Sequence, residues 1–466
     1  MIAKQQQIQH LYQRAGFGLR PDELAKKKGR SIPKLVEELF RDSEKYSQLR
    51  FIPDPLKGRS DKEVKDLKLA VLFVKSFQQL QKLNLHWMDK MATDSGQLRE
   101  RMTFFWHNHF ATHVKISWLM QVQNNTLRKH ALGSFRKMLH AIAKDPAMLI
   151  YLNNQQNTKK APNENFAREV MELFTLGEGK YSEQDIKESA RAFTGWKTNR
   201  KGQFEFKRKQ HDFGEKTFMG KKGNFSGEEI IDMILDKPEC AEFITRKVYQ
   251  YFVNPVVDEK IVKDLSKEFY KSDYDISTLL LNIFLSDWFY EEKNRGCLIK
   301  SPVELIVSYK RLLDIEMRNE RFLLQNQRLL GQMLFNPPNV AGWPHATEWI
   351  DSSSLMIRMR LPGIIFGMDE FDIEVDPEYE SMGVQDNEVW VPKRQKAHAN
   401  WKPILKHYRN VPTRELAGAI VDNLILSPKD RIDLKALRDF ADNNDRESLI
   451  KTLFIRCMAL PEFQTC

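Results

Sequence analysis

The sequence predicts a mainly α-helical protein, with a multi-helical globular core and a small β-hairpin or loop insertion near residues 197–224. Three observations lead to this fold class. Apolar residues recur at intervals of three and four, as in residues 64–87, which is the period of an amphipathic helix. Capping patterns such as Ser182 followed by Asp185 precede several of these segments. Strand-like alternation is confined to residues 203–207, inside the insertion.

The predicted helices follow one another along most of the chain. Gly16, Pro146 and Gly177 each end a periodic segment, since proline and glycine interrupt helices for different steric reasons. The segments with helical spacing are residues 5–15, 32–40, 62–92, 97–114, 124–144, 166–176, 182–194, 228–235, 243–252, 261–270, 276–284, 302–313 and 321–330.

Three regions are expected along the chain. Residues 1–368 form a main helical domain that includes the insertion at 197–224. Residues 369–388 hold nine acidic residues and neither Lys nor Arg, a composition typical of a solvated linker or insertion. Residues 389–466 are expected to form a C-terminal helical element that packs on the main domain.

Composition places the chain among ordinary soluble globular proteins. Its 466 residues are 41% hydrophobic and 29% charged. The net charge of +10 permits acidic partners without requiring them. The four cysteines are scattered and form no CxxC pair, so reduced thiols are expected rather than a zinc–cysteine site or a disulfide framework. The chain shows neither a signal peptide nor an apolar run of about 20 residues, so we expect a cytoplasmic protein with no membrane span.

The insertion at residues 197–224 is basic. It contains nine Lys and Arg residues and three acids, a net charge of 9 − 3 = +6. Phe204, Phe206 and Phe213 interleave with these cations, a combination that single-stranded nucleic acid favours. No recognisable nucleic-acid module surrounds them, so we expect a solvated basic loop and no nucleic-acid partner.

The most unusual stretch is FFWHNHF at residues 104–110, followed by His113. On a helix, His107 and His109 lie about 200° apart and cannot bind one ion from one face. His109 and His113 have the i, i+4 spacing that zinc sites use. Two interpretations stay open. In the first, one histidine packs in the core and is bonded to backbone, while the other reaches solvent or a cleft; in the second, a histidine is a metal ligand or an acid–base group.

Two further sets of side chains are candidates for chemistry. Glu169 and Glu172 are spaced i, i+3 beside an apolar stripe, where carboxylates either pair with arginine or hold a metal. His211 and Asp212 lie in the basic insertion, on an irregular segment of the kind that often supplies functional groups. The alternative for Asp212 is a turn in which its side chain bonds local backbone.

Residues 332–351 form a loop rich in Pro, Gly and Trp. Asn336, Trp343 and Trp349 in this loop, together with Trp196, are the candidate binding residues. Tryptophan rings on a proline-stiffened path can line a groove for sugars or peptides. The alternative is a rigid loop that plugs the core.

The chain resembles, over nearly its whole length, a large bacterial family catalogued as domain of unknown function 1800. The stretches that carry the resemblance are HLYQRAGFG (10–18), FWHNHFAT (105–112), ALGSFRKML (131–139), DPAMLIYLN (145–153), PNENFAREVMELFTLG (162–177), ARAFTGW (190–196), HDFGEKTFMG (211–220), KSPVEL (300–305) and NPPNVAGW (336–343). The resemblance implies a neighbouring sulfatase-like protein of the alkaline-phosphatase type. Many relatives carry export signals, and this chain shows none.

Two functions are compatible with these residues. The first is an enzyme-like pocket for metal-assisted hydrolysis or acid–base chemistry, with a divalent metal ion as its cofactor. Its catalytic candidates are His107, His109, Glu169, His211 and Asp212, and its metal-ligand candidates are His109, Glu169, Glu172 and His211. The second is a non-catalytic binding or scaffold protein that acts with the sulfatase-like partner and uses the aromatic loop as its contact surface.

Overall fold

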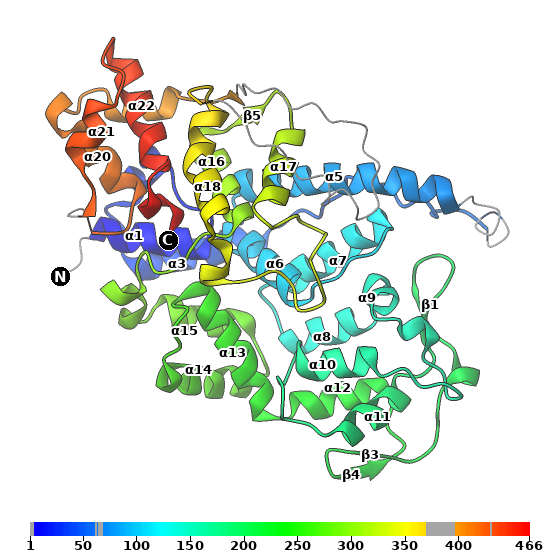
Figure 1. Cartoon of the computed structure of the whole chain (residues 1–466). Helices are drawn as coiled ribbons and strands as arrows, with labels where there is room; N and C mark the ends of the chain where they lie inside the picture. Colours follow the sequence, from blue (N-terminus) through cyan, green and yellow to red (C-terminus); the bar gives the residue numbers. More distant parts are fainter. Residues whose placement is uncertain (1–3, 61–62, 64–68, 370–396, 429–430) are drawn as a thin grey trace.

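The computed structural model describes residues 4–60, 63, 69–369, 397–428 and 431–466. Figure 1 confirms the predicted fold class, because helices make up nearly all of the regular structure. The predicted insertion contains two short antiparallel hairpins, and one further pair of two-residue strands lies elsewhere. Most of the acidic segment 369–388 lies outside the described residues.

The elements have the following bounds. The α-helices are α1 Lys4–Ala15, α2 Pro21–Lys27, α3 Ile32–Glu44, α5 Leu69–Thr93, α6 Gln97–His109, α7 Ser117–His130, α8 Phe135–Ala143, α9 Pro146–Tyr151, α10 Asn165–Glu172, α11 Glu183–Ala192, α12 Gly227–Leu235, α13 Pro238–Phe252, α14 Glu259–Lys271, α15 Ile276–Phe284, α16 Pro302–Leu313, α17 Arg321–Leu329, α18 Ser352–Ile365, α19 Lys402–Tyr408, α20 Thr413–Leu424, α21 Leu434–Asp439 and α22 Arg446–Met458. The strands are β1 Trp196–Thr198, β2 Phe204–Phe206, β3 Lys216–Phe218, β4 Lys221–Gly223, β5 Glu316–Met317 and β6 Ala397–His398.

One segment that was predicted to be a single helix forms two helices in the structure. The periodic segment 124–144 was expected to be continuous, but α7 ends at His130 and α8 begins at Phe135. Ser134 caps α8 by accepting a hydrogen bond from the Lys137 amide, and the Phe135 amide donates to the Tyr274 carbonyl at 2.9 Å. A serine cap and a distant backbone partner therefore replace the hydrogen bonds that a continuous helix would make.

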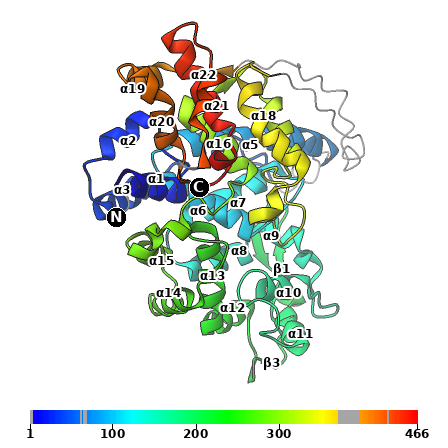
Figure 2. The same cartoon turned by 60° about the vertical axis from the view of Figure 1, so that its left-hand side comes forward.

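The helix that carries the unusual aromatic stretch, α6, lies at the centre of the molecule (Figures 1 and 2). All of its residues except Asn108 are buried, as expected of a helix enclosed by protein on every side. Phe104 belongs to one hydrophobic cluster, built mainly with α5, α16 and the C-terminal helices. Phe105, Trp106 and Phe110 belong to a second cluster, with α1, α8 and α13–α15. The helix therefore joins the two clusters.

The charged side chains of α6 are paired inside this core. Glu100 accepts two hydrogen bonds from Arg128 of α7, at 2.7 and 3.0 Å, and a third from the Trp87 indole at 2.9 Å. Arg99 donates to the carbonyl oxygens of Ser43 and Arg128. Since a buried charge is costly unless it is bonded, these partners make the buried position of α6 tolerable.

The C-terminal end of α6 anchors the Pro/Gly/Trp-rich loop. The Asn108 side-chain oxygen accepts a hydrogen bond from the Trp343 amide at 2.8 Å. Gly342 lies so close that a Cβ atom at this position would be 2.3 Å from the same oxygen, and its φ of +91° lies in the left-handed region. Only glycine therefore fits between the loop and the helix.

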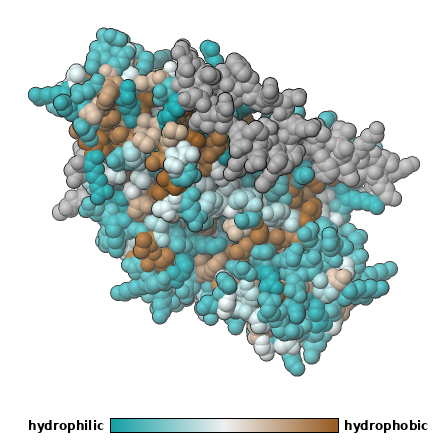
Figure 3. All heavy atoms as spheres, in the orientation of Figure 1, coloured by the Kyte–Doolittle hydropathy of each residue, from teal (hydrophilic) through white to brown (hydrophobic). Residues whose placement is uncertain are grey.

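The two hairpins extend from a part of the molecule that also contains α10, α11 and α12. β1 pairs with β2 and β3 pairs with β4, both antiparallel. Figure 3 shows mostly hydrophilic residues on the visible face of this part. Within the described ranges, no helix combines the length and the apolar character needed to cross a bilayer.

Replacing Gly342 with alanine tests the anchoring of this loop. The Gly342→Ala protein should lose more than about 2 kcal/mol of unfolding free energy, because left-handed strain adds to a clash with Asn108. Gly331→Ala is the matched control: its φ is +82°, but a Cβ atom there meets open space. The control should lose only about 1–2 kcal/mol. Urea unfolding of both variants provides the comparison, and equal losses would contradict the packing described here.

Candidate functional site

His107 is bonded to backbone inside the core. Its ring is 1% exposed, and its Nε2 accepts a hydrogen bond from the Phe335 amide at 3.1 Å. The rings of Trp87, Phe335 and Trp343 surround it at centroid distances of 5.0 to 5.4 Å. Burial, with a smaller contribution from the positive charge of Arg128, lowers the His107 pKa to about 3. The imidazole is therefore neutral near pH 7 and acts as an acceptor for the loop.

His109 faces the other hydrophobic cluster. Its Nε2–H donates to the Phe174 carbonyl oxygen at 3.1 Å, and its ring contacts Trp106 and Phe110. Burial, followed by the nearby Lys247 charge, lowers its pKa well below the usual value. Both histidines are thus held by backbone contacts. The opposite directions expected from helical geometry are consistent with these separate partners.

Glu169 and Glu172 lie on α10 without the expected arginine pair. Arg168 instead makes ion pairs with Glu183 and Glu164, at 2.9 and 3.4 Å. Glu172 accepts a hydrogen bond from the Tyr181 hydroxyl at 2.9 Å. Burial and then the negative charge of Glu172 raise the Glu169 pKa. His109 bonds to the Phe174 carbonyl oxygen, which lies just beyond the end of α10. Neither the Glu169 nor the Glu172 carboxylate takes part in that hydrogen bond.

His211 and Asp212 form a compact turn. The His211 Nδ1–H donates to the Thr194 carbonyl oxygen at 2.9 Å, and the Phe206 and Phe213 rings flank the imidazole. Asp212 pairs with Arg191 at 2.7 Å and accepts a hydrogen bond from the Gly214 amide at 2.7 Å. The Arg191 contact is the main reason that the Asp212 pKa lies below its usual value. These bonds match the local-turn alternative.

The predicted metal centre is not assembled in this structure. Among the described residues, no group of three or more His, Cys, Asp and Glu side chains is arranged to hold a metal ion. The predicted ligands His109, Glu172 and His211 have the separate partners given above, and Glu169 has Glu172 as its nearest predicted neighbour on α10. The prediction relied on residue types, which do not reveal whether distant segments meet.

The predicted binding tryptophans are core residues. Trp343 is 2% exposed and Trp349 is 6% exposed, and Trp196 is buried against Phe193 and Phe204. Asn336 is exposed. The rings therefore offer almost no surface to a sugar or peptide. The loop is buried at residues 334–335 and 342–343, with exposed residues between them.

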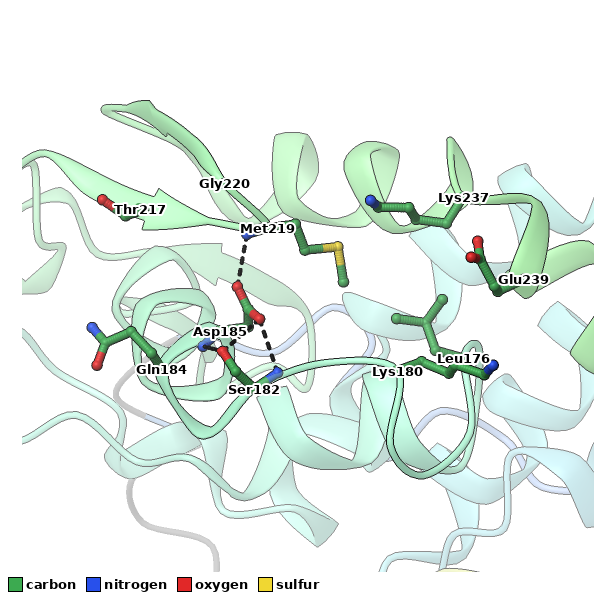
Figure 4. Close-up of a pocket in the computed structure, with 10 residues that line it drawn as sticks. All are labelled: Leu176, Lys180, Ser182, Gln184, Asp185, Thr217, Met219, Gly220, Lys237 and Glu239. Carbon is green, nitrogen blue, oxygen red and sulfur yellow. Dashed lines mark hydrogen bonds between the residues drawn. The ribbon is translucent and has the colours of Figure 1, made fainter.

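A polar pocket of about 480 Å³ lies on the hydrophilic part of the molecule. Figure 4 shows its walls: the β3–β4 hairpin with Met219, the start of α11 with Asp185, and the start of α13 with Lys237 and Glu239. Leu176 and Lys180 line the side nearest α10. Asp185 accepts hydrogen bonds from the Ser182 amide and hydroxyl and from the Met219 amide, at 2.7 to 2.9 Å. The Asp185 carboxylate therefore has a structural role, because it bonds both to Ser182 and to the hairpin at Met219.

Sequence reasoning missed a cluster of buried charges between α6, α13 and α16. Arg101 forms an ion pair with Glu304, and the Tyr251 hydroxyl donates to the same carboxylate at 3.4 Å. The Lys300 Nζ donates to the Phe463 carbonyl oxygen at 2.6 Å, and burial lowers its pKa to about 8. The available signal was the run Arg99-Glu100-Arg101 directly before the aromatic stretch, since charges buried beside such a stretch need partners.

Histidine titration tests the neutral, backbone-bonded state of α6. The ring resonances of His107 and His109 should keep their neutral positions from pH 8 to pH 5, because burial lowers both pKa values. Protonation must then occur mainly in the unfolded chain, so each buried histidine lowers stability as pH falls below about 6.5. NMR of histidine-labelled protein measures this directly. A midpoint above pH 5 for His107, or a midpoint for His109 that is not below the ordinary histidine value, would contradict the assignment.

Comparison with known proteins gives one finding. Neither a curated protein nor a solved structure matches this chain. The family model described as "Protein of unknown function (DUF1800)" matches residues 10–465, nearly the full length. The resemblance inferred from the nine stretches is therefore confirmed, and the chain belongs to this family of proteins of unknown function.

Proposed function

We propose that this protein is a non-catalytic binding protein and that its ligand occupies the pocket between α11, the β3–β4 hairpin and the start of α13. The observation that carries the proposal is the pocket itself. Its volume of about 480 Å³ lies within the range of small-molecule sites. Its walls come from the β3–β4 hairpin, the starts of α11 and α13, and the segment with Leu176 and Lys180.

Two lysines at the pocket can contact an acidic ligand group. Lys180 and Lys237 both line it, and neither forms an ion pair within the described residues. Two carboxylates line it as well: Asp185, which stays ionised and accepts three hydrogen bonds, and Glu239, so the lysines and carboxylates of the lining balance in charge. The first turn of α13 adds the positive end of a helix, and Lys237 makes no side-chain cap there. Leu176 and Met219 supply apolar contact for the rest of the ligand.

The lining chemistry favours binding over catalysis. Neither histidine nor cysteine is among the lining residues. The Ser182 hydroxyl donates to Asp185 at 2.7 Å and caps α11, so it is held in a structural bond. Covalent catalysis needs a nucleophile and a base that lie within hydrogen-bond reach of each other and of the substrate. Such a pair would have to come from residues other than those that line this pocket. We therefore propose a small ligand with a carboxylate or similar acidic group and a short apolar part.

The alternatives from the sequence have their own tests. Metal-assisted hydrolysis predicts stoichiometric divalent metal in the purified protein and a melting temperature that falls in chelator. The sulfatase-like partner stays a prediction, and co-purification with that protein at micromolar concentration tests it. Finding the metal, with ligands among the predicted residues, would favour the hydrolase over the binding protein.

Calorimetric titration with acetate, succinate, glutarate and phosphate tests the binding pocket. At least one probe should bind, and Lys180→Ala or Lys237→Ala should weaken its binding by about 10-fold or more, because each removes a charge-assisted hydrogen bond. Lys260→Ala is the matched control, an exposed lysine on α14 that does not line the pocket. The proposal would be overturned if none of the probes bound. It would also be overturned if Lys260→Ala weakened binding as much as Lys180→Ala or Lys237→Ala.

A further inference from the structure

The buried charges around Arg101 do not balance. Arg101, Lys300 and Arg358 are buried cations, and Lys300 is only 6% exposed. Their contacts connect them: Arg101 pairs with Glu304, and Arg358 donates to the Lys300 carbonyl oxygen at 2.9 Å. Glu304 is the buried carboxylate among them. Three positive groups thus share one buried carboxylate, and Cys466 is a further group whose negative charge acts on Arg101 and Lys300.

The carboxylate has little capacity left. One Glu304 oxygen accepts from the Ser301 amide at 2.6 Å, in the capping box that begins α16. The other oxygen is shared by Arg101 and the Tyr251 hydroxyl. Glu304 is therefore engaged by Arg101, Tyr251 and backbone, and its single negative charge, which also acts on Lys300 and Arg358, does not balance three cations.

Several donors on the cations are unused. Arg101 Nε and Arg358 Nε and Nη2 are buried and have no hydrogen-bond partner among the described residues. The Lys300 Nζ donates to the Phe463 carbonyl and lies 3.8 Å from the centroid of the Phe463 ring. An ammonium group carries three donors, so its protein partners leave capacity for another acceptor. Buried donors without partners mark places where a water or an ion belongs.

A small cavity lies beside Arg101 and Lys300, and Arg358 is not among its lining residues. Its volume is about 30 Å³, and its lining includes Arg101, Lys300, Glu304, Ser308, Gly16 and Phe17. That volume has room for one water-sized species. A water molecule would satisfy the donors but would leave the excess positive charge buried, which is the costlier part.

We propose that this cavity binds a small monovalent anion of the size of chloride. The anion supplies the missing counter-charge to Arg101 and Lys300 and accepts the hydrogen bonds that their unused donors offer. It sits where the N-terminal segment, α6, α16 and the C-terminal residues meet, so it ties together segments that are distant in the sequence. This site shares no lining residue with the pocket at α11, and each can fail without the other.

Anion exchange at constant ionic strength tests the site. The full chain at pH 7 is melted in sodium gluconate, which is too large for the cavity, and then with increasing chloride or bromide in its place. The melting temperature should rise saturably, by about 2–4 °C at roughly 100 times the dissociation constant. The same melting temperature in every anion, or a rise that never saturates, would overturn the proposal.

Two lysines with similarly lowered pKa values provide a matched pair of variants. Lys300→Met should abolish the saturable rise. Lys247→Met should retain it, because Lys247 is a half-buried lysine whose pKa is also lowered to about 8 by desolvation but which lies outside the cavity lining. Loss of the rise in both variants would contradict the assignment. If Lys300→Met fails to fold, crystals of the unaltered chain grown in bromide decide the question. An anomalous peak within hydrogen-bond distance of Lys300 Nζ or Arg101 is expected, and its absence would refute the site.

Discussion

The structure depends on two hydrogen bonds from a distant loop to the end of α6. The Phe335 amide donates to His107 and the Trp343 amide donates to Asn108, across more than 200 residues of sequence. Irregular backbone in a protein core needs partners for its N–H groups, because unpaired buried donors cost about 1–3 kcal/mol each. The side chains of α6 provide those partners. The aromatic and histidine-rich stretch is therefore explained first by packing and hydrogen bonding.

The same helix joins the two hydrophobic clusters through charged as well as apolar side chains. Glu100 bonds to Arg128 on one side, and Arg101 bonds to Glu304 of α16 on another. Pairs of this kind are expensive to bury but specify which elements meet, since removing one partner leaves an uncompensated charge. Arg101 has the additional property that its neighbourhood carries excess positive charge. Because of that excess positive charge, we regard the surroundings of Arg101 as a candidate ligand site, whereas the Glu100–Arg128 pair is a structural ion pair.

Local features of this fold could be predicted from the sequence, and long-range ones could not. Apolar periodicity gave the segments that became α3, α12 and α16, because the helix period is a local property. A β-hairpin or loop was predicted in the basic insertion, and the structure has two hairpins there. The break at Ser134 was missed because the Tyr274 carbonyl that bonds the next residue is far along the chain. The roles of His107, His211 and Trp343 depend equally on distant partners: a loop amide, the Thr194 carbonyl and the Asn108 side chain.

Residue-resolved hydrogen exchange of the Phe335 and Trp343 amides tests the central claim most directly. Both amides lie in an irregular loop, where exchange is ordinarily fast. If α6 holds this loop through His107 and Asn108, both should exchange as slowly as the amides within α6 itself. Exchange at the rate of exposed loop amides, while α6 stays protected, would contradict the claim that this helix organises the fold.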